Sequence, residues 1–323
     1  MKNIVSSLTA AAALLLAVPL AACSSTGGAA NAGGGPGGGG LEIALVTHAA
    51  AGDTFWDVVR KGAEDAAEVY GVALQYANDP EGSRQAQLVQ QYVDQELDGI
   101  VVTLAKPEAM RGAVEGALAA DVPVVSINAG DAEWREMGVT AHFGQDEEKA
   151  GEGLGEYLAE QGYEHPLCVI HEQGNVGHEA RCAGLRGVLP KTEILYVDGR
   201  SMPQVTATVL ASLQSGTKAD VAVGLGAPYA LAIRQAADTA GSGIAVGSFD
   251  VNPELLQGIL DGGFLFGVDQ QPYLQGYLAV EALHLQHSGG FVVGGGHPVL
   301  TGPAIVDAGN AEAVLEYARQ GTR

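Results

Sequence analysis

The 323-residue chain carries 38 acidic and 16 basic side chains, which gives a formal net charge of −22 at pH 7. Such a charge opposes binding to nucleic acid and to anionic lipid, because both are polyanions. It favours solubility and leaves neutral or cationic small molecules and other proteins as the expected partners.

The N-terminal segment is typical of a cleaved export signal. Residues 1–23, MKNIVSSLTAAAALLLAVPLAAC, contain one lysine, an apolar run and then small residues directly before Cys23. The apolar run is shorter than the ~20 residues that span a bilayer, which argues against the alternative of a transmembrane anchor. The end of the segment resembles a bacterial lipobox, which implies a signal peptide of residues 1–22 and a lipidated Cys23.

The segment that follows is predicted to be a flexible tether. Residues 23–40 contain nine glycines and no charged side chain, so they cannot form a packed core. No Gly-Lys-Ser/Thr follows the glycines, which argues against a phosphate-binding loop. We therefore predict an exported protein. We expect its lipid alone to attach it to the extracytoplasmic face of the cell membrane.

From residue 41 onward, strands and helices are predicted to alternate. Runs rich in Val, Ile and Leu are typical of buried parallel strands, and amphipathic helical stretches such as residues 54–71 lie between them. The predicted strands are residues 41–48, 72–77, 98–104, 122–128, 138–143, 167–172, 193–198, 219–225, 243–249 and 264–270. This order indicates the α/β class.

Two similar lobes are predicted instead of one sheet. The alternation loosens after residues 124–134, and a second series of strands and helices begins at residues 144–162. In open α/β sheets the ligand lies beyond the carboxyl ends of the strands, so we expect the functional residues there.

Cys168 and Cys182 are predicted to form a disulfide. The first lies in a predicted strand and the second in the following helix, so packing of the two elements would bring the sulfur atoms together. An exported compartment permits the bond. The alternative is a pair of small buried thiols.

The residues that follow the predicted strands are mostly amides, carboxylates and aromatics. They are Asp53, Phe55, Trp56, Thr103, Asn128, Gln145, Asp146, Glu172, Asn175, Gly226, Phe249, Asp250, Asp269 and Gln270. Amides and carboxylates form hydrogen bonds with hydroxyl groups, and an aromatic face packs against the C–H face of a sugar ring. This set therefore suits a polyhydroxylated ligand.

Phe55 and Trp56 are adjacent at the start of a predicted helix. Neighbouring helical residues diverge by about 100°, so the two rings cannot both point into the core. We expect one of them to face the ligand. The alternative for Trp56 is packing against the sheet together with Val59 and Ala63.

Several motifs, in their order and spacing, resemble the periplasmic-binding-protein-like sugar receptors of the ribose/galactose type, which are the solute receptors of ABC importers. The motifs are GDTFW, DGIVVTLAKPEAM, VPVVSIN, HFGQDEEKAGEGLGEYL, EARCAGL, VGSFDVNPE and FGVDQQPYLQGY, within residues 41–306. The resemblance implies two Rossmann-like lobes, the type I periplasmic binding protein fold, joined by a three-segment hinge. The lobes would be residues 41–144 with 271–300, and residues 145–270 with 301–323.

The resemblance also implies roles for individual residues. Asp53 matches a polar ligand contact, Phe55 and Trp56 match ring-stacking aromatics, and Arg181 matches an arginine that reaches sugar oxygens. Asp250 matches the carboxylate of a Phe-Asp pair, and Gln270 matches a hinge-side amide. Further correspondences add a final group of candidates, Thr103, Asn128, Gln145 and Asn175.

The chain departs from the ribose-binding pattern at two positions. Asn128-Ala129 stands where ribose receptors have Asp-Arg, and Gly226 stands where they have asparagine. A charge-assisted contact is lost at the first position. The expected ligand is therefore a small neutral sugar or polyol other than ribose, bound by a monomer that delivers it to a membrane permease.

Catalysis, cofactors and metals are not expected. His171, Glu172 and His178 lie in a strand end and turn, so they do not form the helical zinc motif H-E-x-x-H. There is no Gly-x-Ser-x-Gly motif in the sequence. Two alternatives stay open: an exported carbohydrate-active enzyme that uses Asp53, Asp250 or Asp269, and a ligand-presenting sensor for a chemotaxis or kinase system.

Overall fold

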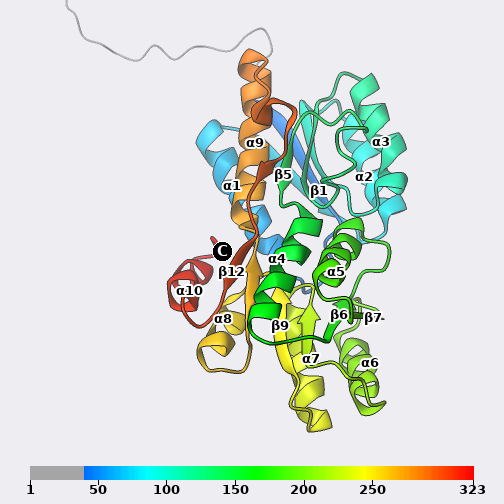
Figure 1. The fold of residues 1–323 in the computed structure, drawn as a ribbon. Coiled ribbons are helices and arrows are strands. Elements are labelled where there is room, and N and C mark those ends of the chain that lie inside the picture. The colour runs from blue at the N-terminus through cyan, green and yellow to red at the C-terminus, as the bar shows by residue number, and fades with distance from the viewer. Residues whose placement is uncertain (1–39) are drawn as a thin grey trace, which may run out of the picture. The chain divides into compact units, whose positions relative to one another are not determined.

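The structure is a computed structural model that describes residues 40–323 (Figure 1). The predicted signal peptide, Cys23 and all of the predicted tether except Gly40 lie outside the described residues. Among the helices of residues 40–323, none combines the length and the apolar character that crossing a bilayer requires.

The first sheet contains six parallel strands in the order β11-β5-β4-β3-β1-β2. They are β1 (Glu42–Thr47), β2 (Ala73–Asn78), β3 (Gly99–Thr103), β4 (Val124–Asn128), β5 (His142–Gly144) and β11 (Val299–Leu300). Alternate residues of β1 face opposite sides of the sheet, because side chains alternate along a strand. Ile43 and Leu45 pack under α1 (Phe55–Tyr70) and α9 (Pro272–Gly289), whereas Ala44 and Val46 pack under α2 (Gly82–Asp94) and α3 (Pro107–Ala119).

The second sheet repeats this plan in the order β12-β10-β9-β8-β6-β7. Its strands are β6 (Pro166–Ile170), β7 (Glu193–Tyr196), β8 (Val221–Gly224), β9 (Ala245–Phe249), β10 (Gly267–Asp269) and β12 (Ala304–Val306), the last antiparallel to β10. Cys168 and Ile170 face α4 (Glu147–Glu160) and α5 (Val176–Val188). The opposite face packs against α6 (Met202–Gln214), α7 (Ala227–Ala240), α8 (Pro253–Leu260) and α10 (Ala311–Arg319).

The predicted α/β class with two sheets is confirmed, and each of the ten predicted strands is present. The short strands β11 and β12, which follow α9 and a 3-10 turn at Val293–Gly296, were not predicted. The chain passes between the two sheets three times, after β5, after β10 and between β11 and β12. The lobe boundaries stay a prediction.

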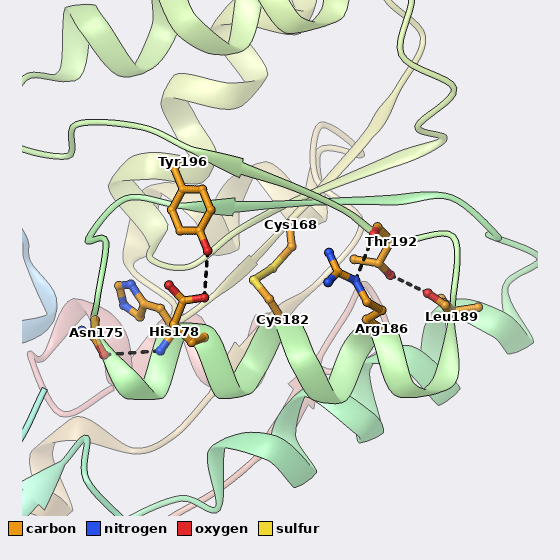
Figure 2. The surroundings of a disulfide bond; sticks show 9 residues. Cys168, Asn175, His178, Cys182, Arg186, Leu189, Thr192 and Tyr196 are labelled. Carbon is orange, nitrogen blue, oxygen red and sulfur yellow. Dashed lines mark hydrogen bonds between the residues drawn. A yellow bond between two sulfur atoms is a disulfide. The ribbon is translucent and has the colours of Figure 1, made fainter.

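The disulfide between Cys168 and Cys182 is confirmed (Figure 2). It joins the middle of β6 to the middle of α5, with the two Cα atoms 6.0 Å apart. Tyr196, on the neighbouring strand β7, donates a hydrogen bond to Glu179 at the start of the same helix. Helix α5 is therefore tied to the sheet at more than one point.

Helices α4 and α5 approach each other to backbone contact. A Cβ atom placed on Gly151 would lie 2.1 Å from the carbonyl oxygen of Arg181, and one on Gly184 would lie 2.0 Å from the carbonyl oxygen of Glu148. No real Cβ atom fits at such a distance, so only glycine permits this packing.

The first sheet has an equivalent contact between α1 and α9, which lie side by side (Figure 1). A Cβ atom on Gly62 would lie 2.0 Å from the carbonyl oxygen of Tyr273, and one on Gly276 would lie 2.0 Å from that of Val59. Each sheet thus has one helix pair whose backbones touch.

We predict that Gly184→Ala lowers the free energy of unfolding by roughly 1–3 kcal/mol, because the new methyl group forces α4 and α5 apart. Gly153→Ala is the matched control, since Gly153 lies within α4 and a Cβ atom there meets open space. It should raise stability by roughly 0.5–1 kcal/mol through the lower chain entropy of alanine. Urea denaturation measures both, and equal stabilisation by the two substitutions would contradict the close packing.

Candidate ligand-binding site

A cavity of about 470 Å³ lies at the carboxyl ends of strands from both sheets. Loops and helices of the first sheet contribute His48, Asp53, Trp56, Lys106 and Asn128 to its lining. The second sheet contributes His171, Glu172, His178, Arg181, Tyr229 and Asp250. The position agrees with the expectation for open α/β sheets.

Five of the ten ligand contacts predicted from the sequence line this cavity, namely Asp53, Trp56, Asn128, Arg181 and Asp250. Asp53 is half-buried just before α1 begins, and the other four are buried. The structure thus brings together residues from 53 to 250 of the chain. Their roles in binding stay a prediction.

Asn128 and Asp250 occupy equivalent positions in the two sheets. Asn128 is the last residue of β4 and Asp250 directly follows β9, and each strand is third in the order of its sheet. Both have left-handed backbones, with φ of 63° and 62°. Residues other than glycine rarely adopt this conformation, and it recurs at functional sites.

Four other predicted contacts lie behind the lining, and two of them, Gln270 and Thr103, support lining residues. The Gln270 amide donates a hydrogen bond to Asp250 at 2.6 Å and accepts one from Asn128 at 3.1 Å. The Thr103 hydroxyl bonds to the Nδ1 atom of His48 at 2.7 Å. These two residues orient side chains that reach the cavity.

The other two are Asn175 and Gln145. Asn175 caps α5 by accepting hydrogen bonds from the backbone of Gly177 and His178, and its amide donates to Glu172 at 2.8 Å. Gln145 donates to Glu147 at 2.8 Å. Neither side chain lines the cavity.

The expectation that the rings of Phe55 and Trp56 cannot both point into the core is wrong, because both are buried in the same core cluster. Trp56 lines the cavity, whereas Phe55 lies in the core and meets the Trp56 ring edge-on at 4.9 Å. Trp56 also packs in the core and meets the His48 ring edge-on at 4.8 Å. The tryptophan therefore combines the cavity-facing and the packing interpretations.

The sequence did not predict that His48, His171, His178 and Tyr229 line the cavity. His171 stacks on the Tyr229 ring at 3.5 Å and lies 4.4 Å from the His178 ring. The Nδ1 atoms of His171 and His178 are buried and have no hydrogen-bond partner among the described residues. His48 and His171 directly follow β1 and β6, so the strand-end rule could have found them.

Arg181 is held in place by a buried ion pair. Its Nε and Nη2 atoms donate to the two oxygens of Glu147 at 2.6 and 2.8 Å, and its guanidinium lies 4.9 Å from the centre of the Phe249 ring. Burial alone would lower the pKa of Arg181, but the carboxylate of Glu147 raises it above the ordinary value. Arg181 is therefore charged and fixed before any ligand arrives.

Burial shifts two carboxyl groups and three imidazoles of the cavity lining toward their neutral forms. It raises the pKa of Asp250 to about 7, although Arg181 and the hydrogen bond from Gln270 act in the opposite direction. Burial likewise raises the pKa of Asp53 to about 6. Burial also lowers the pKa of the lining histidines, which are His48, His171 and His178. The imidazoles are thus neutral, and each can donate one hydrogen bond and accept another.

Comparisons with known proteins agree with this geometry. The periplasmic binding protein domain family matches residues 43–290. The chain is also similar to the crystal structure of a carbohydrate transporter from Acidothermus cellulolyticus 11B in complex with myo-inositol. The two are 42% identical with a TM-score of 0.87, over 88% of this chain and 100% of the other.

Two further similarities are more limited. An ABC transporter solute-binding protein from Agrobacterium vitis with bound D-fucose is 23% identical, with a TM-score of 0.76 over 86% of this chain and 98% of the other, and indicates the fold alone. The xylose/arabinose-binding protein XylF of Sulfolobus acidocaldarius is 49% identical over 45 residues. That alignment spans 14% of this chain and 11% of the length of that curated relative.

Asp250 should make stability depend on pH in the ligand-free protein. The pKa is about 7 in the folded protein and roughly 4 in an unfolded chain. The neutral carboxyl of Asp250 stabilises the folded protein fully below the unfolded-state pKa of roughly 4. This stabilisation is lost as the pH rises through the folded-state pKa of about 7. The amide in the variant Asp250→Asn does not titrate, so the stability of this variant relative to the parent should rise by roughly 2–3 kcal/mol between pH 5 and pH 8. Urea denaturation at both pH values measures this change, and a constant difference would contradict it.

Proposed function

This chain belongs to the periplasmic binding protein domain family, and from that premise we propose that it is the solute-binding protein of an ABC importer. Its ligand is a small neutral sugar or polyol, held in the cavity at the strand ends. The protein binds the ligand without converting it and delivers it to the membrane permease.

The observation that carries this proposal is the lining of the cavity. Each hydroxyl group of a polyol both donates and accepts hydrogen bonds. The neutral imidazoles of His171 and His178 line the cavity, and Asp53 and Asp250 supply acceptor oxygens. Trp56 adds an aromatic surface for C–H groups. This mixture satisfies a ring with several hydroxyls.

A cyclitol such as myo-inositol is the ligand we favour. The 42% identical carbohydrate transporter was crystallised with myo-inositol. Myo-inositol has a hydroxyl group on each ring carbon, so it needs polar partners on all sides. The cavity has such partners from both sheets, including Asn128 and Arg181.

Delivery to a permease requires two lobes that can close and attachment to the membrane. For both we propose the arrangement predicted from the sequence. The lobes are residues 41–144 with 271–300 and residues 145–270 with 301–323, and the monomer is anchored outside the cytoplasm through Cys23. A contact between the two proposed lobes supports their closure. The backbone N–H of Val176, at the start of α5, donates a hydrogen bond to the carbonyl of Ala105, which follows β3, at 3.0 Å. A ligand bound from both sides adds to such contacts and favours the closed arrangement.

The purified protein should bind a polyol without turnover. We expect myo-inositol, tested in a panel with D-arabinose, D-fucose, D-galactose and D-ribose, to raise the melting temperature most. Chromatography of the incubated sugars should recover them unchanged. Formation of a product would establish the enzyme alternative, and a panel without any melting shift would contradict the proposed ligand class.

Trp56→Ala should weaken binding about ten- to a hundredfold, because the ligand loses ring stacking and apolar burial worth ~1–3 kcal/mol. Trp134→Ala is the matched control, since Trp134 is buried in the core of the same sheet and does not line the cavity. It should lower the melting temperature but leave the affinity of the folded fraction intact. Calorimetric titration checks both, and equal affinities in the two variants would contradict the placement of Trp56 at the ligand.

A further inference from the structure

Each permanent cation that lines the cavity is already paired with a carboxylate of the protein. The Nζ atom of Lys106 lies 3.0 Å from Glu172, and the Nε atom of Arg200 lies 2.8 Å from Asp198. Arg181 has the pair with Glu147 described above. Among the residues of the lining, no lysine or arginine is left without a protein carboxylate.

Two of the five carboxylates that line the cavity are in the opposite situation, whereas Glu81, Glu172 and Asp198 belong to ion pairs. Asp53 and Asp250 line the cavity, and neither has a cation within 4 Å among the described residues. An anionic ligand would meet these two groups without a free cation to offset them. When these carboxyls are ionised they repel a ligand anion in a cavity of low dielectric, and when they are protonated they offer it no positive charge.

Of the three pairs, only Arg181 and Glu147 are fully enclosed, with side chains 3% and 0% exposed. Lys106 and Arg200 reach solvent, with side chains 26% and 68% exposed, so water screens their charges. The electrostatic character of the inner cavity therefore depends chiefly on whether Arg181 is neutralised.

Glu147 does not line the cavity, so its effect on a ligand acts through Arg181. It is the first residue of α4, where the positive end of the helix dipole favours a carboxylate, and Gln145 donates a hydrogen bond to it. The Glu147 carboxylate accepts hydrogen bonds from two of the five N–H donors of the Arg181 guanidinium, one on Nε and one on Nη2. The remaining donors of Arg181 have no hydrogen-bond partner among residues 40–323 and are available to hydroxyl oxygens.

We propose that Glu147 is a specificity-determining residue that reserves the site for neutral polyols by neutralising Arg181, and thereby excludes ring polyols that carry a carboxylate. The inference rests on the proposed function. Without Glu147, Arg181 presents a buried, unpaired guanidinium, whose planar donors match a carboxylate in two-point geometry. A uronate would then replace the missing partner.

The test compares myo-inositol with D-glucuronate in calorimetric titrations of four proteins. The parent should bind glucuronate at least ~100-fold more weakly than myo-inositol, since the carboxylate is desolvated without a partner. In Glu147→Gln the ratio should shift toward glucuronate by at least about tenfold, and in Glu147→Asp, whose shorter side chain weakens the pair, by about threefold. The matched control Glu148→Gln, at the exposed neighbouring position, should keep the ratio of the parent.

A merely structural role of Glu147 predicts a lower melting temperature with an unchanged ratio, and that result would overturn the inference. Comparable binding of glucuronate and myo-inositol by the parent would also overturn it. If Glu147→Gln does not fold, the comparison of Glu147→Asp with Glu148→Gln decides. If the parent binds no neutral sugar, the proposed function fails, and the inference is then judged by whether glucuronate raises the melting temperature of Glu147→Gln but not of the parent.

Discussion

The backbone contact between α4 and α5 is the constraint on which the candidate site depends. Gly151 and Gly184 allow the two helices to touch, which brings the first residue of α4, Glu147, onto Arg181 of α5. The disulfide holds the same helix to β6 from the other side. Helix α5 is thus fixed between a neighbouring helix and the sheet, and it presents His178 and Arg181 to the cavity in one orientation.

Burial explains why this cavity suits an uncharged ligand. Desolvation disfavours the charged forms of the lining histidines and of Asp53 and Asp250, so the histidines are neutral near pH 7 and the two carboxyls hold a proton more readily than usual. Arg181 stays charged, and Glu147 balances that charge. A polyol brings hydroxyls that bond to all of these groups, and its transfer from water needs no counterion.

The architecture was largely accessible from sequence patterns because those patterns reflect local burial. Buried parallel strands are apolar on both faces and helices on one face, so their order along the chain reports the α/β class directly. The disulfide followed from the placement of its cysteines on a strand and the next helix. The strands β11 and β12 have two and three residues and show no period of their own, since they form only against β5 and β10.

The sequence alone determined the class of the fold, the alternation of its elements and the edge of the sheets at which the cavity lies. Only the tertiary structure decided which side chains reach that cavity. Trp56 lines it and Phe55 does not, and Gln145 turns away to bind Glu147, although all three follow strands. His178 reaches it from within a helix. The reason is physical: position in the chain places a residue at a strand end, but packing against distant segments sets the direction of its side chain.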